Sequence, residues 1–131
     1  MTIIESDVYD ETFMKLDEAK QTDALKNGNA RFASLCLKHG IVNASIATPA
    51  PYIPYRIGIV CVLISAFTSM IGTDWREVGN GQQIDTYKVK VDALENELKE
   101  LLSSFTTTMC GYDDEDDSDE TSSSSIRFYR G

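Results

Sequence analysis

The longest apolar stretch of the chain runs from Pro54 to Gly72, PYRIGIVCVLISAFTSMIG. Its apolar positions surround a helical wheel instead of forming one stripe, which is typical of a helix that other elements cover on most sides. Proline is favoured in the first turn of a helix and glycine just after the last turn, so these two residues are suitable ends. The pattern predicts a central helix over residues 54–72.

The strongest periodic signal lies closer to the C-terminus. Apolar residues there follow one another in steps of three and four, at Ile84, Tyr87, Val91, Leu94, Leu98, Leu101 and Phe105. This spacing lines one face of a helix, which Asp85 can cap at its start. Glu95 and Lys99 are placed to pair on its outer side. Three heptads can pack within one chain or dimerise, and we favour packing against the central helix.

Two helical patterns precede the apolar block. The first begins at Ser6 or Asp7 and continues as Val8, Phe13, Leu16 and Ala19 recur at roughly helical spacing. Lys26-Asn27-Gly28-Asn29 then has the composition of a turn. The second pattern runs from Asn29, a suitable N-cap, to His39, whose charge would suit the negative end of the helix dipole before Gly40.

The segments between these patterns are predicted to be irregular. Residues 41–53 lead into the central helix as an extended connector, because prolines at 49, 51 and 54 are incompatible with a regular helix there. Residues 73–81, TDWREVGNG, are predicted to form a polar loop that carries the one tryptophan of the chain.

The uncharged run from Ile57 to Gly72 also has to be weighed as a membrane span. Its 16 residues are fewer than the roughly 18–20 that a helix needs to cross a bilayer. Arg56 and Asp74 flank it, and Ser65 interrupts it together with two further hydroxyl residues. These features favour a buried core helix in a protein that has no membrane contact.

The charge of the chain is concentrated in one place. The net charge is −9 over 131 residues, yet residues 113–120, DDEDDSDE, hold seven of the 21 acidic groups. The remaining 14 acidic residues face 12 basic ones, so the rest of the chain is close to neutral. A hydrophobic content of 42% is typical of a globular domain, and no basic footprint for nucleic acid is present.

No catalytic or metal-binding constellation is readable, so we expect no enzyme activity and no cofactor. The three cysteines, Cys36, Cys61 and Cys110, are widely spaced and form no CxxC pair, which indicates free thiols in a reducing cytoplasm. His39 is the one histidine and is placed as a helix-end residue.

The N-terminus lacks the basic and apolar regions of a signal peptide. The acidic block lacks the internal glycine and terminal glutamate of a calcium-binding loop.

Composition divides the chain into a helical domain, residues 1–112, and a C-terminal arm, residues 113–131. The arm begins with an acidic segment of Asp113, Asp114, Glu115, Asp116, Asp117, Asp119 and Glu120, and serines follow. Such a composition is typical of disorder. The arm ends in an apolar and basic stretch suited to docking on a partner, made of Ile126, Arg127, Phe128, Tyr129 and Arg130. The expected fold is therefore all-α, with about four helices packed around a central apolar helix and an extended C-terminal arm.

The order of these elements resembles the head-to-tail adaptor (connector) proteins of tailed double-stranded DNA bacteriophages. The resemblance covers residues 5–112: short helices, a proline-containing connector (TPAPYIP), one highly apolar helix, a polar loop and the helix YKVKVDALENELKELL. A C-terminal extension follows in both. The long acidic and serine-rich insert before SIRFYRG departs from the family pattern.

The resemblance implies a structural virion protein at the neck of the particle, made in the host cytoplasm. Members of this family form a ring, commonly of twelve copies, beneath the portal protein and above the tail or its stopper and terminator proteins. Their arms reach onto the portal or a neighbouring subunit, which implies that role for Ser122 to Gly131. DNA would pass through the ring without sequence-specific binding, and the acidic block would keep it from sticking.

A second hypothesis from a different functional class stays open at this point. The chain can instead be a soluble regulator whose acidic segment binds a basic partner or mimics DNA. This hypothesis predicts that neutralising residues 113–120 destroys function, whereas the connector hypothesis predicts a milder defect.

Overall fold

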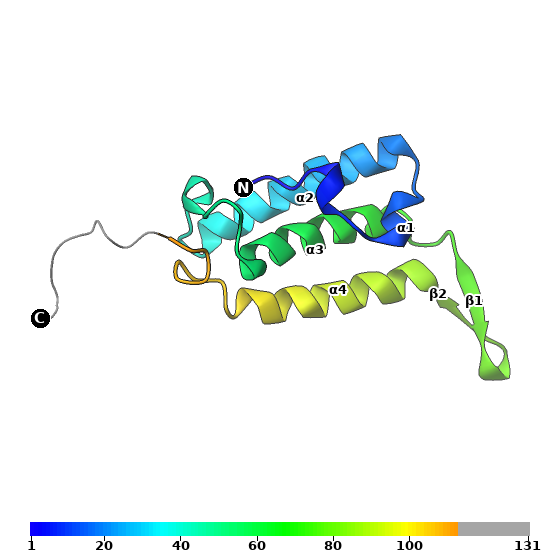
Figure 1. Cartoon of the computed structure of the whole chain (residues 1–131). Helices are drawn as coiled ribbons and strands as arrows, with labels where there is room; N and C mark the ends of the chain where they lie inside the picture. The colour runs from blue at the N-terminus through cyan, green and yellow to red at the C-terminus, as the bar shows by residue number, and fades with distance from the viewer. Residues whose placement is uncertain (113–131) are drawn as a thin grey trace, which may run out of the picture.

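A computed structural model of the protein describes residues 1–112, in which three helices run side by side and a hairpin projects from one end (Figure 1). The α-helices are α1 (Glu11–Met14), α2 (Glu18–Lys38), α3 (Tyr52–Thr68) and α4 (Thr86–Leu102), and the strands are β1 (Trp75–Val78) and β2 (Gln82–Asp85). Short 3-10 helices occupy Glu5–Asp7, Asn43–Ser45 and Gly79–Gly81. The predicted helical class is confirmed, but the strict all-α class is wrong because two strands are present.

Helix α3 packs against α2 on one side and α4 on the other (Figure 1). Eleven of its seventeen residues are buried, from Pro54 to Phe67. The helix begins at Tyr52, earlier than predicted, because Pro51 serves as N-cap and Pro54 fits the first turn. It also ends earlier, at Thr68, where 3-10 hydrogen bonds tighten the chain before Gly72 turns with a φ of 91°.

Helix α2 is longer than the sequence predicts. The expected turn at residues 26–29 lies inside the helix, so the prediction of a second helix starting at Asn29 is wrong. Gly28 faces α3 so closely that a Cβ atom there would lie 2.5 Å from the Cα of Val62. The Asn29 amide exchanges hydrogen bonds with the backbone N–H and C=O of Ile3. Both residues therefore serve tertiary packing, which overrides their turn preference.

The first predicted helix is interrupted in the structure. Asp10 caps α1 by accepting the N–H of Phe13, and Asp17 caps α2 by accepting the N–H of Lys20. Each aspartate has extended backbone dihedrals, so the chain bends at both positions. Two short elements, the 3-10 turn Glu5–Asp7 and α1, thus replace one continuous helix before residue 18.

Helix α4 forms almost where the periodicity predicts it and packs on α3, as expected. Asp85 caps it by accepting the N–H groups of Tyr87 and Lys88, which confirms that prediction. The expected pair of Glu95 with Lys99 is wrong, because Glu95 binds Arg31 of α2 instead. Residue 84, the first of the periodic apolar positions, lies in β2 rather than on the helix.

The predicted polar loop at residues 73–81 contains the first strand of an antiparallel hairpin. Trp75 lies opposite Asp85 and Val78 opposite Gln82. The tip turns through Asn80 and Gly81, whose φ angles are 65° and 77°. Asparagine and glycine tolerate this left-handed conformation, which explains why GNG can close a hairpin.

Candidate interaction surfaces

The hairpin is the most exposed element of the described chain. Every β1 residue is exposed, and in β2 only Asp85 is buried. Apolar side chains remain exposed on it: Trp75 by 56%, Val78 by 37% and Ile84 by 37%. Isolated two-stranded hairpins are at best marginally stable in water, so this element depends on its anchorage to the helices. It also offers apolar side chains to a partner.

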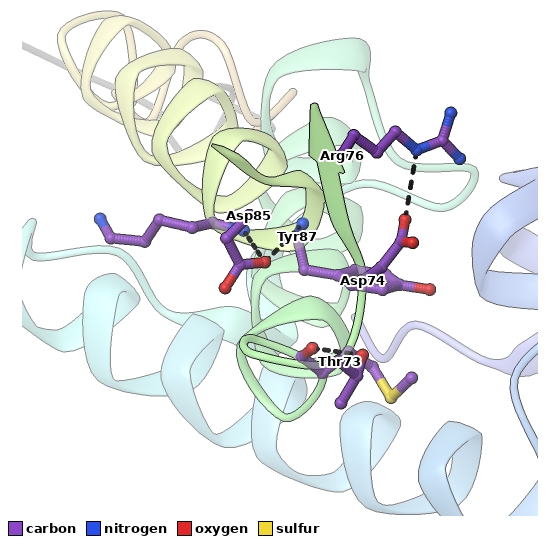
Figure 2. A network of polar contacts seen from close by, with 7 residues as sticks. Thr73, Asp74, Arg76, Asp85 and Tyr87 are labelled. Carbon is purple, nitrogen blue, oxygen red and sulfur yellow. Dashed lines mark hydrogen bonds and ion pairs between the residues drawn. The ribbon is translucent and has the colours of Figure 1, made fainter. Parts of the chain in front are cut away.

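The base of the hairpin is held by a network around Asp85 (Figure 2). One Asp85 carboxylate oxygen accepts the Gly72 N–H at 2.7 Å, and the other accepts the N–H groups of Tyr87 and Lys88. The Thr86 N–H donates to the Asp74 carbonyl, across the base from Asp85. A single buried carboxylate thereby fixes the end of α3, β2 and the start of α4 relative to one another.

A second apolar surface lies on the N-terminal segment. We define the N-terminal surface as the exposed side chains Ile4, Tyr9 and Met14, which are 56%, 86% and 61% exposed. They line a hollow of about 580 Å³, together with the buried Val8 and Phe13. Large exposed apolar side chains gathered around one hollow are typical of a binding surface, which makes the N-terminal surface a candidate.

A third group of exposed apolar residues lies where α2 ends and α3 begins. Leu37 is 81% exposed, Val42 59%, Tyr52 66% and Met109 48%. The segments that carry them are joined by hydrogen bonds, such as the one between the Tyr112 hydroxyl and the Val42 carbonyl. We call this group the α2–α3 end surface.

Two bidentate ion pairs tie α4 to its neighbours. Arg31 of α2 donates to both carboxylate oxygens of Glu95, at 3.2 and 3.0 Å. Arg56 of α3 donates to both oxygens of Glu97, at 2.7 and 3.0 Å. The side chains of both pairs are about one third to two fifths exposed, so water weakens each pair. Their fork geometry mainly fixes the orientation of the helices.

The cysteine thiols and the histidine of the body are held in packed surroundings. The three thiols, Cys36, Cys61 and Cys110, are free and buried, and burial raises the pKa of each, that of Cys61 to about 12. Such thiols are poor nucleophiles, because the reactive thiolate is disfavoured. The His39 ring lies 5.5 Å from that of Phe105, with Nδ1 at 3.1 Å from the Leu35 carbonyl oxygen.

Metal-binding and membrane-spanning features are not found in residues 1–112. No group of three or more His, Cys, Asp or Glu side chains in this range is placed to hold a metal ion. Within the same range, no helix is both long and apolar enough to cross a membrane.

The site residues predicted from sequence all lie outside the described residues. These are the docking residues at 126–130 and the acidic segment at 113–120. Sequence reasoning missed the hairpin and the N-terminal surface. The exposed Tyr9 lies between Asp7 and Asp10 in DVYDETFMK, and this acidic setting was the one available signal, whereas Met14 lies between Phe13 and Lys15 and gave none.

Comparisons of the chain with protein-family models, with curated proteins and with solved structures give no match.

Proposed function

We propose that this protein is a structural virion component, a head-to-tail connector (adaptor) of a tailed double-stranded DNA bacteriophage. In this proposal twelve copies form a ring at the neck of the particle. The portal protein lies on one side of the ring, and the tail or a stopper or terminator protein lies on the other. DNA passes through the channel without sequence-specific binding.

The observation that supports this proposal best is the distribution of exposed apolar side chains. They occupy three separate parts of the described surface: the hairpin, the N-terminal surface and the α2–α3 end surface. A ring subunit needs two different faces for its two neighbours, since ring contacts are heterologous, and further surfaces for the proteins above and below. The three apolar surfaces of residues 1–112, together with the C-terminal arm, can supply these contacts.

We further propose that α3 is the central helix around which the ring body is built. Its side chains contact α2 and α4, so the element with the most buried positions is shielded from neighbouring subunits. The hairpin and the N-terminal segment, which lie on the outside of this packing, are then the elements available for assembly. Substitutions in α3 are expected to act on stability and those on the surfaces to act on assembly.

The C-terminal arm has two roles in this proposal. Residues 122–131 reach onto the portal or a neighbouring subunit, where an extended peptide gains main-chain hydrogen bonds and alternate side chains choose the site. The acidic segment, residues 113–120, faces the channel and repels the DNA backbone.

Co-expression with the portal protein of the same phage tests the proposal. We expect the two proteins to co-purify and negative-stain images to show a second ring attached to the portal ring. The double substitution Trp75→Ser and Ile84→Ser at the exposed hairpin should reduce the ring, while Lys88→Ser on the exposed face of α4 serves as control. A portal that never binds the protein would contradict the proposal and favour the acidic regulator.

A further inference from the structure

The N-terminal surface is a ready-made receptor for an apolar segment. Its hollow has a floor of Val8 and Phe13, which are 3% and 0% exposed, and a rim of the exposed Ile4, Tyr9 and Met14. An apolar side chain of a ligand placed there would cover the rim residues. It would itself be transferred out of water, which is favourable. Tyr9 is the most exposed of the three rim residues. It also lines a neighbouring hollow between the N-terminal segment, α3 and α4.

This receptor is held in shape before any ligand arrives. The Gln21 side-chain amide donates to the carbonyl oxygens of Phe13, Met14 and Leu16, at 3.1, 3.2 and 3.0 Å. On the other side of the surface, the Tyr55 hydroxyl donates to the Asp7 carboxylate at 3.0 Å. Binding to a preformed surface costs less ordering entropy, so even a short peptide can bind it.

The charge of the N-terminal segment favours a basic ligand. The first 23 residues contain seven acidic side chains and two lysines. The acidic residues are Glu5, Asp7, Asp10, Glu11, Asp17, Glu18 and Asp23. Of these, Glu5 lines the hollow itself, and Asp7 and Asp10 line the neighbouring one. The cations Arg56 and Lys90 line the neighbouring hollow, but Arg56 is engaged by Glu97. A segment that is apolar and positively charged is therefore complementary to the N-terminal surface.

The chain itself contains such a segment at Ile126–Arg130, which has three apolar residues, two arginines and no acidic residue. We propose that Ile126–Arg130 of one copy binds the N-terminal surface of a second copy. This inference rests on the proposed ring, and it names the partner of the arm as a neighbouring subunit. A contact between two different surfaces of identical chains is heterologous, which is the kind that closes a ring.

The length of the chain sets the reach of this contact. The described body ends at Tyr112, which is anchored to Val42 at the α2–α3 end surface. Thirteen residues, 113–125, separate Tyr112 from Ile126, and at roughly 3.3–3.6 Å per residue they can span up to about 45 Å. Repulsion between the acidic segment and the acidic side chains near the N-terminal surface, Glu5, Asp7 and Asp10, confines the contact to the residues that follow the acidic segment.

A peptide titration tests the contact directly. The receptor is the full chain carrying Arg127→Glu and Arg130→Glu, so that its own arm cannot compete. The probe is a synthetic peptide with the sequence of residues 122–131, followed by amide NMR shifts. We expect saturable shifts confined to residues 4–14, at least tenfold weaker binding after adding Tyr9→Ser, and unchanged binding after adding Tyr52→Ser. Shifts elsewhere, or none at millimolar peptide, would overturn the proposal.

Mixing two defective chains separates binding between copies from binding within one copy. One chain carries Glu5→Lys, Tyr9→Ser and Glu11→Lys, and the other carries Arg127→Glu and Arg130→Glu. The first chain keeps an intact arm and the second keeps an intact N-terminal surface, so one contact can form between them. Analytical ultracentrifugation should therefore show a 1:1 heterodimer in the mixture and no dimer of either chain alone. Absence of the heterodimer would overturn the proposal, because the arm then acts within its own chain or on another partner.

The proposed function can fail or stand independently of this contact. If the ring on the portal forms normally with Tyr9→Ser and with the charge-reversed arm, the connector function stands and this inference is wrong. If the peptide binds the N-terminal surface but no ring is ever found on a portal, the contact stands and the connector function is wrong.

Discussion

The carboxylate of Asp85 accepts a 2.7 Å hydrogen bond from the backbone N–H of Gly72, thirteen residues earlier in the chain. This bond closes the base of the hairpin and joins the end of α3 to the start of α4, whose first N–H groups the same carboxylate caps (Figure 2). The position of the projecting hairpin therefore depends strongly on the Asp85 side chain. Any partner that binds the hairpin relies on Asp85 to place it.

Replacing Asp85 with alanine should destabilise the protein by about 2 kcal/mol, because loss of an N-cap costs about 1 kcal/mol and an N–H left without its partner adds a similar amount. Urea denaturation measures the change. Asp92→Ala removes an exposed carboxylate of the same helix and should change stability by less than about 0.5 kcal/mol. Equal effects of the two substitutions would contradict the role of Asp85.

Gly28→Ala should destabilise the protein although alanine is the better helix former. The new Cβ would lie 2.5 Å from the Val62 Cα and 2.6 Å from its Cγ2, so α2 and α3 must move apart. Overpacking costs about 1–3 kcal/mol, which exceeds the gain of about 1 kcal/mol in helix propensity. Thermal and urea unfolding measure the net loss.

Gly79→Ala is the matched control for that substitution, because nothing lies within 4 Å of its Cβ position. Its unfolding should match that of the wild type to within about 0.5 kcal/mol. A stabilising Gly28→Ala would mean that α2 and α3 are not in close contact at this point, and it would remove the physical reason why α2 continues through residues 26–29.

The pairs Arg31–Glu95 and Arg56–Glu97 should each show a coupling energy of about 0.5–1 kcal/mol in a double-mutant cycle. Both are bidentate but partly exposed, so the coupling should fall as NaCl is raised from 0.05 to 0.5 M. The exposed pair Lys88–Asp92 is the control, with coupling of about 0.3 kcal/mol or less. A salt-independent coupling in the first two pairs would contradict an electrostatic origin.

The buried thiols give the stability of the protein a specific dependence on pH. In the folded state the pKa of Cys61 is raised from its usual 9.0 to about 12, so the unfolded chain loses this proton first. The contribution of this thiol to stability should therefore be constant below pH 8 and fall as the pH rises above 9, until the folded thiol also ionises near 12. Urea midpoints between pH 7 and 10.5 measure this loss, and Cys61→Ala should reduce its slope.

Thiol labelling checks the same burial in a second way. At pH 8 the folded protein should react with a thiol reagent many times more slowly than the urea-unfolded protein, in which all three cysteines react. Rapid labelling of one thiol in the folded state would show that its helix opens locally, contrary to the packing described above.

Deletion of Ser125 to Gly131 should abolish assembly while the monomer remains folded, because the body of residues 1–112 has its own core. Circular dichroism and unfolding measure the fold, and the oligomeric state measures assembly. Replacing the acidic residues of 113–120 with neutral ones should cause a milder defect. Unchanged assembly after the deletion would show that the arm is not needed for assembly.

The sequence predicted the elements whose side chains are periodic and missed those whose side chains are not. Helix α4 repeats its apolar residues over several turns, so its place and its cap at Asp85 could be predicted. The hairpin could not, since every residue of its strands WREV and QQID except Asp85 is exposed and the strands show no alternation. The sequence predicts a turn around Gly28, although α2 is continuous there. The contact of Gly28 with Val62, which requires a glycine, is visible only in three dimensions.

The candidate surfaces were less predictable than the helices. Exposed apolar residues such as Tyr9 and Leu37 resemble core residues in a sequence, and only their place in the fold shows that they face outward. The acidic and the apolar-basic parts of the arm were evident from composition, but they lie outside the described residues.

Cryo-electron microscopy of the native particle that contains this protein tests the central claim most directly. The connector account predicts a closed ring around an axial channel between portal and tail, with the arm of each copy lying on another chain. A single copy bound to a basic surface, with no ring, would contradict the account and favour an acidic regulator.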